Sequence, residues 1–234
     1  MCGEQALSKC GSQKAWHWAH AGKRHCDPWW ENETDWHRYW KNLFPENTRE
    51  VVHYDEVTGE KHIADVKTGR GMVIEFQHSA MPPEELASRE AFYGNMIWIV
   101  DGKPFQKQFE ILESQLPHPN SDILKERIFY APQASIFYMR AELESGESMV
   151  ELFSAKPIEQ QIIADYRGHH FYKWTRPREI WLNATSPVFL DFGTDELVRL
   201  MHYNPKTQRC LQRISKRHLV EKNGGVFSAY AREA

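Results

Sequence analysis

The stretch IADVKTGRGMVIEFQ, residues 63–77, decides the expected fold of this chain, because it reads as two strands joined by a tight turn. The sequence just before it, residues 50–66, also alternates with the period of a strand and carries a turn at 58–59. After the second turn, at 67–71, the strand is predicted to run over 72–77. Three consecutive strands are therefore expected.

The segments on either side complete the pattern. A helix is predicted over 32–44, where Trp36 and Trp40 lie on one face. A second helix is predicted over 84–93, and the unbroken apolar run 96–100 is typical of a strand buried on both faces. The order helix, three strands, helix, strand predicts an α/β fold with a mixed sheet covered by helices on both sides.

Beyond residue 103 the pattern is weaker. Strands are predicted at FYKW (171–174), REIWL (178–182) and PVFLDFG (187–193), and a short helix at TDELVRLM (194–201). These segments are hydrophobic enough either to build a second small domain or to extend the sheet. Both arrangements stay open at this point.

Composition favours a globular chain without membrane spans. The 234 residues are 41% hydrophobic and 26% charged. They contain neither an apolar run of roughly 18 residues nor a basic-then-apolar leader, so we expect a cytoplasmic protein with no membrane partner. The net charge is -3, but residues 199–222 hold seven Lys or Arg and one acid. This segment either contacts phosphates or forms a solvated basic face.

Two acids flank the second turn. Asp65 ends one strand, and Glu75 lies inside the next between Ile74 and Phe76. Carboxylates are rarely fully buried unless they are paired or bound to metal. The turn brings the two acids close, which predicts an oxygen-ligand site for Mg²⁺ or Mn²⁺. In the alternative interpretation, Glu75 lies on an exposed face and Asp65 merely opens a turn.

A polar ridge follows the first helix. Glu33, His37 and Lys41 stand four residues apart, beside the stripe of tryptophans. A carboxylate, an imidazole and an ammonium on this flank would be aimed at the same metal and phosphate site. The alternative is a surface ladder of side chains, worth a few tenths of a kcal/mol per pair.

Five blocks stand in one order within residues 10–102: ETDWHRYWK (33–41), HIADV (62–66), IEFQHS (74–79), EELASREAFY (84–93) and MIWIVDG (96–102). In this order and spacing they resemble the nuclease domain of competence protein CoiA-like proteins. The resemblance implies a restriction-endonuclease-like fold of the PD-(D/E)XK superfamily, with a core of mixed sheet flanked by helices.

The same resemblance assigns roles to single residues. Asp65 takes the place of the motif aspartate, Glu75 that of the second acid, and Gln77 that of the usual lysine. Glu33 matches the acid of the first helix, and His37 and Lys41 match the polar positions that follow it. The expected substrate-binding residues are Arg70, Ser79, Arg89 and Tyr93. For Arg89, a helix-surface salt bridge with Glu85 is the alternative.

Glutamine in place of lysine is a departure from the superfamily, though CoiA-like proteins are similar in carrying it. Lysine orients the attacking water and stabilises negative charge, whereas Gln77 can orient water but carries no charge. Either Lys41 supplies the cation or the metal carries more of the electrostatic role. Asp65 and Glu75, with Glu33 directly or through water, are expected to hold one or two Mg²⁺ or Mn²⁺ ions.

The amino terminus suggests a zinc site. Residues 1–30 are poor in aliphatic side chains and resemble the zinc-ribbon-like region ahead of the CoiA-like nuclease domain, with HWAH at its His-x-x-His position. The first cysteine of the upstream pair is missing here. The site is therefore either completed by other cysteines or lost. The candidate Zn²⁺ ligands are Cys2, Cys10, His17, His20 and Cys26.

These observations predict a zinc-ribbon-like remnant over 1–30, a nuclease core over 31–115, and an α+β carboxy-terminal extension over 116–234 that binds nucleic acid or a partner. The expected function is a metal-dependent deoxyribonuclease, with DNA as its partner and self-association left open. Two alternatives are a nuclease-derived module that binds nucleic acid without cutting it, and a zinc-stapled adaptor or toxin-like protein. The setting, whether DNA uptake, mobile-element competition or phage defence, is not specified by the residues.

Overall fold

The computed structural model describes most of the chain beyond the amino-terminal segment. Side chains are described for residues 33–55, 59–145, 150–203 and 208–227. In the amino-terminal segment only the main chain of two antiparallel strands is described, β1 (Ala6–Lys9) and β2 (His17–His20). The predicted zinc ligands therefore lie outside the described side chains.

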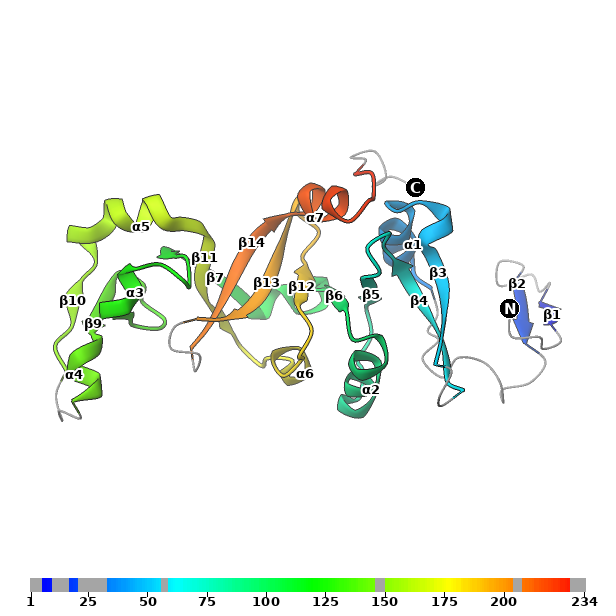
Figure 1. Ribbon diagram of the computed structural model, residues 1–234, viewed down its shortest axis with the longest axis horizontal. Helices are drawn as coiled ribbons and strands as arrows, with labels where there is room; N and C mark the ends of the chain where they lie inside the picture. Colours follow the sequence, from blue (N-terminus) through cyan, green and yellow to red (C-terminus); the bar gives the residue numbers. More distant parts are fainter. Residues whose placement is uncertain are drawn as a thin grey trace.

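A nine-stranded sheet forms the centre of the molecule (Figure 1). The parallel pairs are β5 with β6 and β6 with β12, whereas the other neighbours are antiparallel, so the sheet is mixed as predicted. From one edge to the other the strands are β3 (Arg49–Tyr54), β4 (Lys61–Lys67), β5 (Val73–Gln77), β6 (Met96–Asp101), β12 (Val188–Asp191), β13 (Glu196–His202), β14 (Arg209–Ser215), β11 (Tyr166–Trp174) and β7 (Phe109–Pro117).

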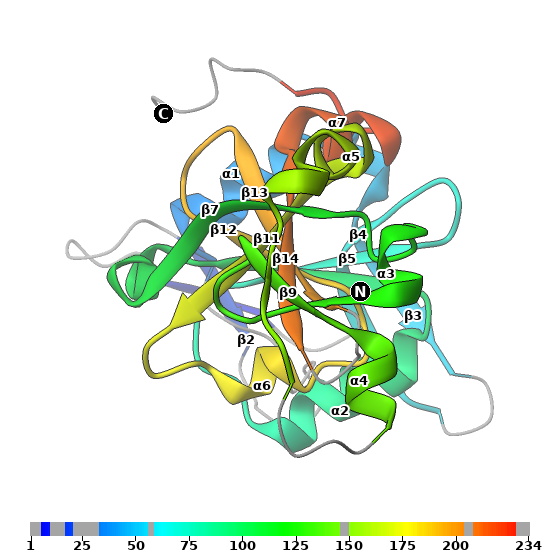
Figure 2. The same ribbon diagram turned by 90° about the vertical axis from the view of Figure 1, so that its left-hand side faces the viewer.

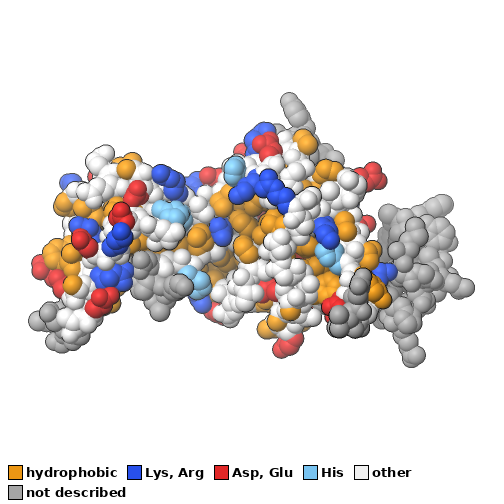
Figure 3. All heavy atoms as spheres, in the orientation of Figure 1, with side chains coloured by type: hydrophobic (Ala, Val, Ile, Leu, Met, Phe, Trp, Pro, Cys, Tyr) orange, Lys and Arg blue, Asp and Glu red, His pale blue; other side chains and the backbone are white. Residues whose placement is uncertain are grey.

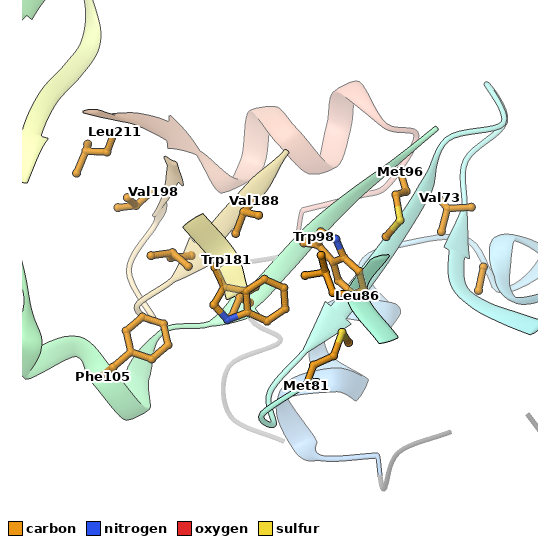
Figure 4. Close-up of a cluster of buried hydrophobic side chains, with 13 residues drawn as sticks. Val73, Met81, Leu86, Met96, Trp98, Phe105, Trp181, Val188, Val198 and Leu211 are labelled. Atoms are coloured by element: carbon orange, nitrogen blue, oxygen red, sulfur yellow. The ribbon is translucent and has the colours of Figure 1, made fainter. Parts of the chain in front are cut away.

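Helices cover both faces of this sheet. In Figures 1 and 2, α1 (Asp35–Asn42) and α7 (Lys216–Lys222) lie on one face, while α2 (Pro83–Tyr93) and α6 (Glu179–Leu182) lie on the other. Each face has its own buried apolar cluster. Figure 4 shows the cluster beneath α2 and α6, where the rings of Trp98 and Trp181 lie 5.6 Å apart.

A smaller unit packs beside β7 and β11 at one end of the sheet (Figure 1). A third apolar cluster joins it to β7, β11 and β14. The unit contains α3 (Ile123–Glu126), β8 (Arg127–Phe129), β9 (Ile136–Met139), α4 (Arg140–Glu144), β10 (Phe153–Ser154) and α5 (Glu159–Asp165). Short 3₁₀ helices span Glu46–Thr48, Lys103–Gln108 and Lys156–Ile158.

The predicted order of elements up to residue 102 is confirmed, with shifts of a few residues at the ends. Two predictions further along are wrong. Residues 178–182, expected as a strand, contain helix α6, and residues 194–201, expected to form a helix, contain most of strand β13. The apolar spacing in 194–201 fits a helix, but pairing with β12 and β14 determines the structure there.

Of the two arrangements open for the carboxy-terminal part, the structure shows the extended sheet. Strands β12, β13 and β14 follow directly on β6 in the sheet, so residues from both sides of position 116 share one sheet. Within the described part of the chain, no helix is long and apolar enough to cross a membrane.

Candidate metal and catalytic site

Helix α1 is placed by one cap and one aromatic stripe. The Thr34 hydroxyl accepts a hydrogen bond from the His37 main-chain N–H, which caps the first turn. On the buried side, Trp40 is 0% exposed and stacks on Phe76 of β5 with ring centroids 5.6 Å apart. The helix flank that carries the predicted polar ridge is thereby held against β4 and β5.

Asp65 and Glu75 meet where β4 and β5 separate. Regular pairing joins Val66 to Ile74 and then gives way to side-chain bonds. The Asp65 carboxylate accepts a hydrogen bond of 2.9 Å from the Phe76 N–H, and the Asp65 N–H donates to Glu75 Oε1 over 3.2 Å. Because carboxylates take the place of main-chain acceptors, the two acids are drawn together at the opening between the strands.

Arg89 of α2 supports the other side of Glu75. Its guanidinium donates to Glu75 Oε2 over 3.1 Å and to Glu85 over 2.5 Å, and Arg89 is 5% exposed. The salt bridge with Glu85, one of the two interpretations of Arg89, is thus present together with a second bond into the site. As placed, Arg89 steadies Glu75 from inside the protein.

Lys41 connects α1 to the acidic pair. Its ammonium lies 2.5 Å from Glu33, 2.9 Å from Glu50 and 4.0 Å from Asp65 Oδ1. Burial opposes its charge, but the bonds from Glu33 and Glu50 outweigh that effect and raise the pKa of Lys41. Lys41 is therefore a cation at the edge of the site, and it bridges Glu33 to Asp65.

His37 lies behind the acidic pair, against β5. Its Nε2 lies 2.6 Å from the Phe76 carbonyl, and its Nδ1 lies 3.1 Å from the Thr34 hydroxyl. Burial lowers the pKa of His37, so the ring is neutral near pH 7 and its Nε2–H donates to that carbonyl. His37 Nε2 thus holds the main chain of β5, and the phosphate contact expected for His37 stays a prediction.

The remaining predicted residues spread outward from the pair. Gln77 is 1% exposed, and its side-chain amide donates to the Ser79 hydroxyl over 3.1 Å. Arg70 lies exposed in the turn between β4 and β5. Tyr93 lies at the end of α2, where its ring packs edge-on against His53 with centroids 5.1 Å apart. Gln77 and Ser79 therefore belong together, whereas Arg70 and Tyr93 lie at the margin.

The pKa values of both acids, Asp65 and Glu75, are raised above their ordinary values. Burial, with a further contribution from the charge of Asp65, raises the pKa of Glu75 to about 8. Burial also raises the pKa of Asp65, although the Phe76 N–H and the nearby cations oppose the shift. The Asp65 side chain is 24% exposed, which gives the pair its contact with solvent. Two desolvated carboxylates of this kind favour either a shared proton or a cation.

The donor set suits a hard divalent cation, because both acids present oxygen ligands. Among residues 33–55, 59–145, 150–203 and 208–227, however, no three His, Cys, Asp or Glu side chains are grouped as a metal site. Glu33 is held by Lys41 in this arrangement. The three predicted carboxylates therefore divide into a pair, Asp65 and Glu75, and a third that reaches the pair through Lys41.

Asp191 is a buried acid that the sequence reasoning missed. It lies at the end of β12, 2% exposed, and its Oδ1 is 2.5 Å from the ammonium of Lys216, which is also 2% exposed. Its Oδ2 accepts from the indole N–H groups of Trp36 and Trp40 over 3.1 and 2.9 Å. The signal was an acid inside the apolar run PVFLDF, the same signal that identified Glu75.

The Asp191 cluster fixes α1 from the far part of the chain. Because Trp40 also stacks on Phe76, the position of the helix flank that bears Lys41 depends on residues near the carboxy terminus.

Comparison of this chain with protein-family models, with curated proteins and with solved structures gives no significant match.

Proposed function

We propose that this protein is a metal-dependent nuclease that hydrolyses phosphodiester bonds in DNA. One observation carries the proposal. Glu75 is buried and Asp65 is half-buried, and the two acids are brought together at the opening between β4 and β5, with their pKa values raised and a lysine 4.0 Å from Asp65. Two carboxylates removed from water in this way lower the stability of the fold, but their oxygens suit a divalent cation.

Asp65 and Glu75 would hold Mg²⁺ or Mn²⁺ through their carboxylate oxygens. The bound cation would supply an acidified water as the nucleophile and would offset the charge that grows on the phosphate oxygens. Arg89 donates to Glu75 and keeps that carboxylate turned toward Asp65. Glu33 takes part through Lys41, whose ammonium it holds.

Lys41 supplies the cation that Gln77 lacks. Its charge comes from α1 and reaches within 4.0 Å of Asp65, so it lies where a scissile phosphate bound at the pair would meet it. Gln77 is buried on the same strand as Glu75 and is held by Ser79, so it shapes the inner wall of the site. His37 fixes the Phe76 carbonyl and thereby the strand that carries both groups.

The resemblance to CoiA-like nucleases supports the same conclusion from the sequence. It assigns Asp65, Glu75 and Gln77 to the motif positions, and the restriction-endonuclease-like fold that it implies is compatible with a mixed sheet flanked by helices. DNA as the substrate follows from this resemblance and belongs to the proposal.

The test is cleavage of plasmid and linear DNA by purified protein in Mg²⁺, in Mn²⁺ and in EDTA. We expect cutting with either metal and none in EDTA. Asp65→Asn and Glu75→Gln should lower the rate by about 10³-fold or more, because each removes a ligand charge from the cation. The matched control is Glu110→Gln, which neutralises an exposed acid on β7.

Other results would redirect the assignment. Metal-independent binding of DNA without cutting would favour the nuclease-derived binding module. Absence of both binding and cutting would favour an adaptor that acts through protein partners. Equal cutting by wild type and by both site variants would overturn the proposal.

A further inference from the structure

A second polar site lies in the part of the sheet farthest from the acidic pair. A groove of about 630 Å³ is bordered by the chain leaving β7, by β11 and by β14. Five strand spacings separate β5 from β11, which amounts to about 24 Å. The groove has the volume of a small-molecule site. It is therefore a separate feature from the site proposed for metal.

Two arginines without an acidic partner among the described residues lie in or beside the groove. Arg167 lines it, is exposed, and donates only to main-chain carbonyls in the described structure. Arg199, on β13, is half-buried and lies over the ring of Phe189, with no acidic partner among the residues described. Figure 3 shows Lys, Arg and His side chains gathered over this region, between α5 and α7.

One row of registered residues connects these groups across the sheet. Arg199 pairs with Gln212, and Gln212 pairs with His169. Registered neighbours present their side chains on the same face, a few ångströms apart. Gln212 lines the groove, so Arg199 and His169 flank one of its walls.

His169 is the most telling member of this row. It is 0% exposed, and neither of its ring nitrogens has a hydrogen-bond partner among the described residues. Its ring lies perpendicular to that of His118, which lines the groove, with centroids 5.2 Å apart. A buried polar group without a partner is costly, so we expect the His169 nitrogens to meet a water or a ligand group where the ring contacts His118.

The backbone of β11 is irregular just before His169. The register of β11 shifts between Tyr166 and His169, and Gly168 lies in the shift with a φ of +84°. A Cβ atom there would meet the Arg213 carbonyl oxygen at 2.7 Å, so only glycine fits. Bulges of this kind redirect side chains beside functional sites.

Two acids also line the groove, and they narrow the chemistry of the ligand. Asp122 is neutralised by Lys125 at 2.6 Å. Asp165 accepts a hydrogen bond from Ser121 and remains available as an acceptor. The wall thus combines a cationic side, which suits a phosphate, with a carboxylate, which suits an N–H or O–H donor. A nucleotide carries both kinds of group.

We propose that this groove binds a nucleotide, with its phosphate at Arg167 and His118 and its base or sugar donors at Asp165. The same chemistry is offered by a free nucleotide and by a nucleotide unit within a strand. The proposed contacts are made by protein side chains, and they do not depend on cleavage at Asp65 and Glu75.

The test is equilibrium binding in EDTA to four probes: AMP, GMP, labelled single-stranded DNA and inorganic phosphate. Arg167→Ala should weaken nucleotide or DNA binding by about tenfold, because one charged contact is lost. For the DNA probe, the salt dependence should also fall by about one phosphate contact. Lys107→Ala, which removes an equal charge from an exposed position elsewhere, should leave binding unchanged.

His169→Phe separates a ligand role from a structural one. It keeps an aromatic ring in the buried position and removes both unpartnered nitrogens. We expect an unfolding midpoint equal to or above that of wild type, together with binding weakened by roughly tenfold. A structural role would lower the midpoint instead.

Each further outcome decides the matter. Binding of a mononucleotide alone assigns a free nucleotide, and binding of DNA alone assigns a strand. Equal binding of inorganic phosphate, no binding of any probe by wild type, or unaltered binding by both Arg167→Ala and His169→Phe would overturn the proposal. Because the assay contains no metal, loss of the proposed nuclease activity leaves its result unaffected.

Discussion

Two acidic clusters in this molecule, each with a buried carboxylate, differ in how that charge is compensated. Asp191 has a lysine at 2.5 Å and two indole N–H donors, so a single acid is surrounded by several partners. Asp65 and Glu75 lie next to each other. Arg89 donates to Glu75, and the ammonium of Lys41 lies 4.0 Å from Asp65. The first cluster is closed by its own partners, and the second is open to solvent through Asp65, whose side chain is 24% exposed. Asp191 is an acid that holds the fold, whereas for Asp65 and Glu75 we propose a role in binding a ligand.

The closed cluster should be the costlier one to break. Asp191→Ala leaves Lys216 buried without its partner, and we expect a loss of about 3–5 kcal/mol in the free energy of unfolding, measured with urea. The exposed pair between Glu196 and Arg213 is the control, because Glu196→Ala should cost about 1 kcal/mol or less. Similar losses at both positions would remove the distinction between the clusters.

The open cluster should respond to pH in the metal-free protein. The folded state holds a proton on Glu75 up to pH of about 8, whereas the unfolded chain releases it near pH 4.5. The folded state therefore binds more protons in this window, and its stability falls as pH rises.

Glu75→Gln replaces the titrating carboxyl group with an amide that does not titrate. The variant should become more stable than wild type by about 2–4 kcal/mol as the pH rises toward 8, in urea unfolding with EDTA present. A constant difference between the two proteins from pH 5 to pH 8 would contradict the raised pKa. Glu110→Gln, on an exposed site, should show no such trend.

A smaller effect is expected at the contact between the closed cluster and α1. Trp40→Phe keeps an aromatic ring against Phe76 but removes the N–H that donates to Asp191. The expected loss is about 1–3 kcal/mol in the free energy of unfolding, since the acceptor is charged and buried. In the background of Asp191→Ala the same substitution should cost clearly less, because the acceptor is already gone. Equal costs in both backgrounds would show that the hydrogen bond contributes nothing.

The sequence was informative where local pattern and tertiary structure agree. The run 72–77 predicted a strand with Glu75 inside it between Ile74 and Phe76, and Glu75 is buried there. The spacing of Trp36 and Trp40 predicted the face by which α1 packs. It misled at 194–201, where helical spacing lies in a strand because of its two sheet neighbours.

Other features depend on contacts that no local pattern contains. The bond from His37 to the Phe76 carbonyl and the reach of Arg89 to Glu75 join elements distant in the chain. The pairing of Asp191 with Lys216 needs the order of strands across the whole sheet. Asp191 nevertheless carried a usable signal, because it is an acid within an apolar run.

The most direct measurement is the binding of Mn²⁺ to the purified protein at pH 8, detected by electron paramagnetic resonance and by calorimetry. We predict that wild type binds the ion, that Asp65→Asn and Glu75→Gln each weaken this binding by at least tenfold, and that Glu110→Gln leaves it unchanged. Undiminished Mn²⁺ binding in both site variants, or no binding by wild type, would contradict a cation shared by Asp65 and Glu75.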